Sequence, residues 1–287
     1  MKRTLLFLIV CLPMTALAEI KVVASFSILA DMVREVTGEH ARVSTIVGPN
    51  ADAHVYSPNV EDALLVAHAD VIFVNGLGFE TWSNTLIKTS GTKARVFVAS
   101  DGIEPLVVED TIDPHAWNSL ENARRYVTNI AHAMSDVDPK RSDDYHAKAQ
   151  RYIGQIQALH DWAVERIAAL PVDRRTVVTA HDAFGYLANT YKLEFLAPVG
   201  LDTEAEASAH TVARLIDQIK AKRAAALFVE NISNPDLVKQ IARETGLSVN
   251  GRLFSDALSR KGGPATSYLM MFRHNLQSLL TALETKR

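Results

Sequence analysis

The longest regular pattern in the chain is a stripe of apolar residues spaced three or four apart, between Asp138 and Leu170. Side chains with this spacing share one face of a helix. Asp138 suits the N-cap position, Pro139 suits the first helical position, and no further proline occurs before Pro171. The pattern therefore predicts a single helix over 138–170, beyond the usual length of about 8–20 residues. The stripe comprises Tyr145, Ala149, Tyr152, Ile156, Leu159, Ala163, Ile167 and Leu170.

Short apolar runs alternate with helical patterns on both sides of this helix. They predict strands at 21–26, 42–47, 70–75 and 94–99 before it, and at 176–180, 193–198, 225–229 and 248–254 after it. Strands that alternate with helices are typical of parallel α/β sheets. The predicted fold class is therefore α/β, with two lobes that each hold a mainly parallel four-stranded sheet flanked by helices. One long rigid helix is expected to join them.

The first residues of the chain have the pattern of a secretory signal. Lys2 and Arg3 provide the charged start, an apolar run follows, and 16–18 (Ala-Leu-Ala) is a cleavage pattern. Cleavage would remove Cys11, the only cysteine, and 8–10 lacks the small residue expected before a lipidated cysteine. We therefore expect a protein exported to the periplasm without a lipid anchor. The expected organisation is a signal peptide (1–18), an N-terminal lobe (19–137), a connecting helix (138–171) and a C-terminal lobe (172–287).

Charge excludes one large class of function. The chain has 30 Lys and Arg against 33 Asp and Glu, so its formal net charge is −3, and no basic cluster argues for binding to nucleic acid. The chain also has no Gly-x-Ser-x-Gly elbow and no phosphate-binding Gly-Lys-Ser/Thr loop.

Asp182 is expected to cap a helix that begins at Ala183 rather than act as a base. We expect a monomer.

Four residues with metal-binding side chains follow predicted strands, two on each side of the long helix. They are His54, His115, His181 and Asp256. Ligands of open α/β sheets gather at the carboxyl ends of strands, so a cleft between the lobes would bring these side chains together. Imidazole and carboxylate ligands together suit zinc, although a cysteine-free site also admits manganese or iron. Most of the other histidines lie within predicted helices.

Five segments resemble motifs of the metal-specific solute-binding proteins of bacterial ABC importers, the cluster A-I family. They are 52–58 (Asp-Ala-His-Val-Tyr-Ser-Pro), 75–80 (Asn-Gly-Leu-Gly-Phe-Glu), 113–117 (Asp-Pro-His-Ala-Trp), 181–186 (His-Asp-Ala-Phe-Gly-Tyr) and 253–259 (Leu-Phe-Ser-Asp-Ala-Leu-Ser). Together they cover essentially the whole chain after the predicted signal. The resemblance implies two lobes, a long connecting helix and a metal ion held between the lobes.

The resemblance also implies a ligand set and a cargo. It assigns His54, His115, His181 and Asp256 as metal ligands, and a histidine at the third position goes with zinc in this family. The chain is most similar to zinc-binding members that lack a long His-rich loop, because 101–113 contains no histidine. Ala53 and Ser57 replace the usual proline and glutamate, which puts the rigidity of the first loop in question. The implied function is periplasmic binding of Zn²⁺ and its delivery to an ABC permease in the inner membrane, without enzymatic activity.

Three alternatives stay open at this point. A manganese- or iron-binding protein of the same family would use the same positions. A secreted zinc hydrolase would use three histidines and a bound water, with Asp256 outside the coordination sphere. An adhesin-like surface protein would need a lipid anchor, which the sequence around Cys11 in the predicted signal peptide argues against. The sequence also leaves open whether a periplasmic metallochaperone loads the site.

A continuous helix as the only crossover predicts limited motion, because a helix bends sharply only at proline, at a Gly/Ser pair or at a bulge. We therefore expect nearly fixed lobes and an ordering of loops upon metal binding. These loops are the one around His54, 101–114 and 262–264.

Overall fold

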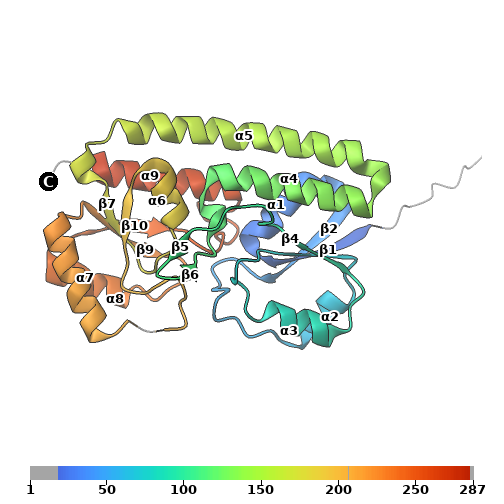
Figure 1. The fold of residues 1–287 in the computed structure, drawn as a ribbon, viewed down its shortest axis with the longest axis horizontal. Coiled ribbons are helices and arrows are strands. Elements are labelled where there is room, and N and C mark those ends of the chain that lie inside the picture. Colours follow the sequence, from blue (N-terminus) through green and yellow to red (C-terminus); the bar gives the residue numbers. More distant parts are fainter. Residues whose placement is uncertain (1–18, 206, 285–287) are drawn as a thin grey trace, which may run out of the picture.

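Two α/β lobes lie side by side beneath one long helix, α5 (Ser142–Ala168), in the computed structural model (Figure 1). The structure describes residues 19–205 and 207–284, so the predicted signal peptide at 1–18 lies outside the described residues. Each lobe contains a four-stranded sheet in which every strand pairing is parallel. The predicted fold class is confirmed.

The first sheet has the order β2-β1-β3-β4 and the second has the order β10-β9-β7-β8. The strands are β1 (Ile20–Phe26), β2 (Ala41–Val47), β3 (Val71–Val74), β4 (Arg95–Val98), β7 (Thr176–Val178), β8 (Glu194–Leu196), β9 (Ala226–Glu230) and β10 (Val249–Leu253). The helices are α1 (Ser27–Thr37), α2 (Val60–Ala67), α3 (Ser83–Ser90), α4 (Leu120–Val137), α6 (Gly185–Tyr191), α7 (Ala209–Lys222), α8 (Asp236–Thr245) and α9 (Tyr268–Glu284). Short 3-10 turns occupy η1 (Gly38–His40), η2 (Ala116–Asn118), η3 (Pro139–Arg141) and η4 (Val172–Arg174).

The long helix is shorter than the sequence predicts. It has 27 residues, which corresponds to about 40 Å at 1.5 Å per residue. Pro139 begins the 3-10 turn η3, and the carboxylate of Asp138 accepts hydrogen bonds from Arg141 Nη1 (2.7 Å) and Tyr145 Oη (3.2 Å) instead of capping the helix. The predicted N-cap was therefore wrong, because side chains rather than backbone amides occupy this carboxylate. All eight predicted stripe residues are buried.

The helix α5 is not the only link between the lobes. It packs against α1 and α4 on one side and against α6 and α9 on the other. The start of α9 also contacts the N-terminal lobe directly, since Tyr268 N donates to Asp31 Oδ2 (2.7 Å) and Tyr268 Oη donates to Trp117 O (2.8 Å). A single apolar core runs from β1 through α5 to α9. These contacts join the lobes over a wide area.

Side-chain caps mark the start of α2, α4 and α7. Asn59 forms a capping box at the start of α2, and the Ser119 side chain accepts from Asn122 N at the start of α4. By contrast, α6 begins at Gly185 with Phe184 at the N-cap position and no side-chain cap. The predicted cap by Asp182 was therefore wrong.

The stretch expected to be an acidic loop contains a short hairpin. Strands β5 (Val107–Val108) and β6 (Thr111–Ile112) pair antiparallel. Glu109 and Asp110 form the turn with φ values of 47° and 66°, a conformation found in the favoured two-residue hairpins. The hairpin leads directly into the segment that carries His115.

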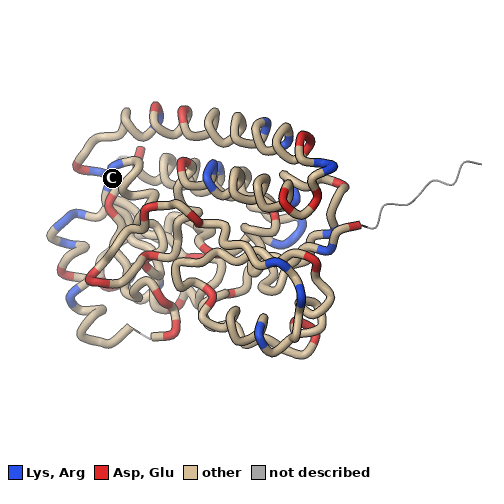
Figure 2. Tube along the Cα trace, turned by 45° about the vertical axis from the view of Figure 1, so that its right-hand side comes forward, with Lys and Arg blue, Asp and Glu red and all other residues tan. Residues whose placement is uncertain are grey.

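Among the described residues, we find no helix that is both long and apolar enough to cross a membrane. Figure 2 shows acidic and basic residues interspersed along the described chain, in agreement with the balanced charge of the sequence.

Candidate metal centre

The structure brings the four predicted ligand residues together between the lobes. His54, His115, His181 and Asp256 each offer one ligand atom, and these atoms all lie within 4.8 Å of one another. It is the only such group of three or more His, Cys, Asp or Glu residues within 19–205 and 207–284. All four side chains are buried, with exposed fractions of 6% for His54 and at most 1% for the others.

The distances within this group match the needs of one four-coordinate ion. Asp256 Oδ2 lies 3.1 Å from His181 Nε2 and 3.4 Å from His54 Nε2, and the two Nε2 atoms of His54 and His115 are 3.2 Å apart. Tetrahedral zinc with ligand bonds of 2.0–2.1 Å separates its ligand atoms by about 3.3 Å. The cluster therefore has the right size for an ion at its centre, and His115 Nε2 is 3.8 Å from Asp256 Oδ1.

Each of the four residues lies beyond the carboxyl end of a parallel strand. His54 follows β2, His181 follows β7 and Asp256 follows β10. His115 follows β4 through the β5–β6 hairpin. This placement is the one expected for ligands of open α/β sheets. Because two residues come from each lobe, the centre requires both lobes.

Two buried carboxylates contact the outward-facing nitrogens of the histidines. His115 Nδ1 lies 2.8 Å from Asp113 Oδ1, and His181 Nδ1 lies 2.7 Å from Glu230 Oε2. A carboxylate at Nδ1 keeps the proton on that nitrogen and turns Nε2 toward the centre. The sequence reasoning missed Glu230; an acidic residue at the end of the apolar run 225–229 was the available signal.

Aromatic side chains form the apolar wall of the centre. The His54 ring packs edge-to-face on Phe79 at 4.8 Å, and the His115 ring lies 5.3 Å from Trp117. The Trp117 indole donates to Ser255 O at 2.8 Å, next to Asp256. The indole thereby connects the second and fourth candidate ligands across the lobes.

The loop that carries His54 is held in place despite its departures from the family motif. Asp52 Oδ1 accepts from His54 N (2.9 Å), and Ala53 O accepts from the Trp82 indole (2.8 Å). Asn50 N donates to Leu258 O (2.9 Å) in the opposite lobe. Hydrogen bonds therefore fix this loop without the usual proline at position 53.

The opposite charges of His181 and Asp256 stabilise each other at the centre. Burial alone would lower the pKa of His181, but the carboxylates of Glu230 and Asp256 outweigh this effect and raise it well above its usual value. Burial would raise the pKa of Asp256, but His181 and His115 outweigh this effect and hold it well below its usual value. A metal ion that enters the centre therefore displaces a proton from His181.

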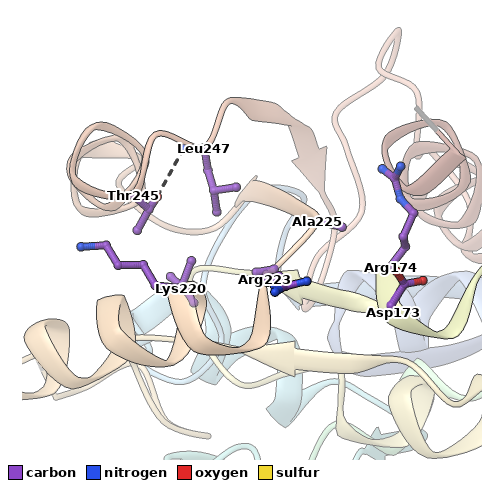
Figure 3. A pocket seen from close by; sticks show the side chains of 9 residues that line it. Asp173, Arg174, Lys220, Arg223, Ala225, Thr245 and Leu247 are labelled. Atoms are coloured by element: carbon purple, nitrogen blue, oxygen red, sulfur yellow. Dashed lines mark hydrogen bonds between the residues drawn. The ribbon is translucent and has the colours of Figure 1, made fainter. Parts of the chain in front are cut away.

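A cavity of about 620 Å³ lies away from the histidine cluster, near the amino ends of β7 and β9, at the opposite edge of the sheet. Lys220, Arg223 and Arg174 line it (Figure 3). Their charged ends do not converge on a common point in this view, and no histidine contributes to the lining. This cavity therefore does not compete with the histidine cluster as a metal site.

Comparisons with known families support a metal-binding role. Residues 22–282 match the family model described as "Zinc-uptake complex component A periplasmic". The manganese-binding lipoprotein MntA of Halalkalibacterium halodurans is 30% identical over 266 residues, which cover 92% of this chain and 88% of that protein. The metal ABC transporter substrate-binding lipoprotein SloC of Streptococcus mutans is 30% identical over 304 residues and 99% of both chains. The iron ABC transporter substrate-binding lipoprotein MtsA of Streptococcus pyogenes is 31% identical over 276 residues, which cover 92% of this chain and 89% of that protein.

Solved structures of periplasmic metal-binding proteins have the same fold as this chain. The periplasmic zinc-binding protein TroA from Treponema pallidum superposes with a TM-score of 0.89 and 27% identity, over 93% of this chain and 99% of that one. The manganese-bound periplasmic metal-binding protein from Candidatus Liberibacter asiaticus superposes with a TM-score of 0.85 and 29% identity, over 92% and 100%.

Proposed function

Because the chain belongs to the ZnuA family of solute-binding proteins of metal ABC importers, we propose that its cargo is Zn²⁺. Members of this family are extracytoplasmic transport proteins and not enzymes, and they work with an inner-membrane permease and its ATPase. The hydrolase alternative is therefore rejected. Which metal this chain carries needs a further argument, since its relatives are named for manganese, iron and zinc.

The observation that carries the zinc proposal is the composition of the cluster, with three imidazoles and a single carboxylate. Imidazole ligands suit zinc, whereas manganese prefers carboxylate, carbonyl and water oxygens. The close spacing of the four ligand atoms also fits tetrahedral coordination. We assign His54, His115, His181 and Asp256 as the zinc ligands, with Asp256 in the position that a hydrolase would leave to water.

We also propose a role for each segment of the chain. Residues 1–18 serve as a cleaved signal that directs the protein to the periplasm. Residues 19–137 and 172–287 form the lobes, and 138–171 forms the connection. The protein acts as a monomer that delivers zinc to its permease.

Metal analysis tests the cargo. Protein purified without added metal and then offered zinc is expected to bind about one equivalent, and a large excess of manganese is expected not to displace it. The His160→Ala variant serves as a control, because His160 on α5 contacts Tyr191 and not the cluster. Zinc uptake well below one equivalent, or displacement by equimolar manganese, would reject zinc as the cargo.

A further inference from the structure

We propose that Glu230 is a positioning residue that fixes the tautomer in which His181 binds the metal. The inference rests on the proposed function, in which His181 is a zinc ligand. Glu230 is the last residue of β9, a strand paired with both β7 and β10, and it is 2% exposed. It therefore occupies a fixed place directly behind the metal centre.

The two oxygens of Glu230 have different partners. Oε1 accepts hydrogen bonds from the backbone amides of Ala180 (2.8 Å) and His181 (2.9 Å). Oε2 lies 2.7 Å from His181 Nδ1. At this distance an unprotonated Nδ1 would set its lone pair against that of the oxygen, so Nδ1 carries the proton. His181 Nε2 faces the centre, 3.1 Å from Asp256 Oδ2, and in the metal-free protein it carries a proton toward that oxygen. The metal ion displaces this proton and takes the Nε2 lone pair, while Nδ1 keeps its own proton.

A glutamine at position 230 would reverse this polarity. The two backbone amides can only be satisfied by an oxygen, so the glutamine oxygen takes the Oε1 position and its NH₂ group faces His181 Nδ1. An amide that donates to Nδ1 favours the tautomer with the proton on Nε2. That proton blocks the metal-binding nitrogen, and moving it to Nδ1 sets two donors against each other.

Asp113 provides a matched comparison within the same site. A single oxygen, Oδ1, accepts from both the amide of His115 (2.9 Å) and its Nδ1 (2.8 Å). Asparagine can keep its own oxygen in that position, so Asp113→Asn preserves the tautomer of His115. Both substitutions remove one negative charge behind one histidine, and they differ in whether the hydrogen-bond polarity survives.

The test compares zinc affinity in wild type, Glu230→Gln and Asp113→Asn by competition with a chromophoric chelator. Loss of an outer contact to a metal-bound histidine typically costs 10–100-fold in affinity. We expect Glu230→Gln to lose about 100-fold and Asp113→Asn about 10-fold or less. Equal losses in the two variants, or a Glu230→Gln affinity within about threefold of wild type, would overturn the inference. Failure of the wild type to bind zinc would instead overturn the proposed function.

Imidazole ¹⁵N NMR gives a readout that a merely structural role would not change. In zinc-loaded wild type, His181 is expected to carry its proton on Nδ1, and in metal-free Glu230→Gln on Nε2. The wild-type spectrum alone decides the matter if Glu230→Gln does not fold. A zinc-loaded wild type with metal on Nδ1 would contradict the assignment of Glu230.

Discussion

Thr203 donates a hydrogen bond from Oγ1 to Asp52 Oδ2 at 2.7 Å and so joins the two lobes beside the metal centre. The other oxygen of Asp52 accepts from the amide of His54. One carboxylate therefore connects the first candidate ligand to a loop of the opposite lobe. Both residues also line a cavity of about 500 Å³ that reaches His181, which places this contact on a path to the buried ligands.

We predict that Thr203→Val accelerates zinc release. A single hydrogen bond contributes about 0.5–1.5 kcal/mol, so dissociation should become roughly 2–13-fold faster. Stopped-flow mixing of the zinc-loaded protein with a chelator measures this rate. Thr89→Val is the matched control, because Thr89 bonds only within α3. An unchanged release rate in Thr203→Val would show that this contact does not restrain the site.

Substitution of individual ligands should give graded losses. Replacing His54, His115 or His181 by alanine should each weaken zinc binding on the order of 100-fold, because a four-ligand zinc site gains about 10–16 kcal/mol in total. Asp256→Ala should be milder, since water can replace a carboxylate oxygen. Competition with a chelator measures each affinity. His68→Ala is the control, and a comparable loss there would mean that the site is misplaced.

Zinc binding should weaken as the pH falls. The pKa of His181 is raised well above its usual value, because Glu230 and Asp256 outweigh the effect of burial. The free site thus holds a proton that zinc must displace, and more protons compete at lower pH. Affinity should fall up to about tenfold for each pH unit below neutrality. Calorimetry in buffers of different ionisation enthalpy should detect the release of about one proton, and the absence of any release would contradict this account.

A partly buried acid away from the centre, Asp31, should make stability depend on pH. Burial raises the pKa of Asp31 to about 6, although its hydrogen bond from Tyr268 N opposes the shift. A raised folded-state pKa means that the folded protein binds more protons between pH 4 and 6 than the unfolded chain. Asp31 therefore destabilises the fold above pH 6, by at most about 3 kcal/mol, and this cost disappears as the pH falls below 4.

Asp31→Asn should remove this dependence. Its amide oxygen can still accept from Tyr268 N. Urea unfolding of the metal-free protein at pH 5 and pH 7 measures the difference for wild type and variant. Wild type and variant with the same change between the two pH values would contradict the assignment to Asp31.

The lobes should stay nearly fixed when zinc binds. The helix α5 is continuous, and Tyr268 ties the start of α9 to the N-terminal lobe. Solution scattering should give the same radius of gyration with and without zinc, while the loops around His54, 101–114 and 262–264 gain resistance to proteases. A clear decrease in the radius of gyration on zinc addition would refute a rigid connection.

Local patterns in the sequence were enough to predict the framework. The eight strands of the two sheets and the buried stripe of the long helix depend on residues close together along the chain. The spacing of apolar residues and the position of turn-forming residues are both local properties of the sequence. The four candidate ligands could be chosen for a related reason. Residues that follow parallel strands meet at one edge, and the motifs around His54, His115, His181 and Asp256 resemble those of a known family.

Only the tertiary structure decided which side chains meet across the lobes. Glu230 lies 49 residues beyond His181, and no spacing rule connects them before β9 and β7 pair side by side. The contact between Asp52 and Thr203 spans 151 residues and exists only because the lobes pack together. Even the predicted local cap at Asp138 did not form, because its carboxylate accepts from the side chains of Arg141 and Tyr145 instead. The sequence determined the strands, the helices and the metal-binding side chains, whereas long-range packing decided what positions and encloses those side chains.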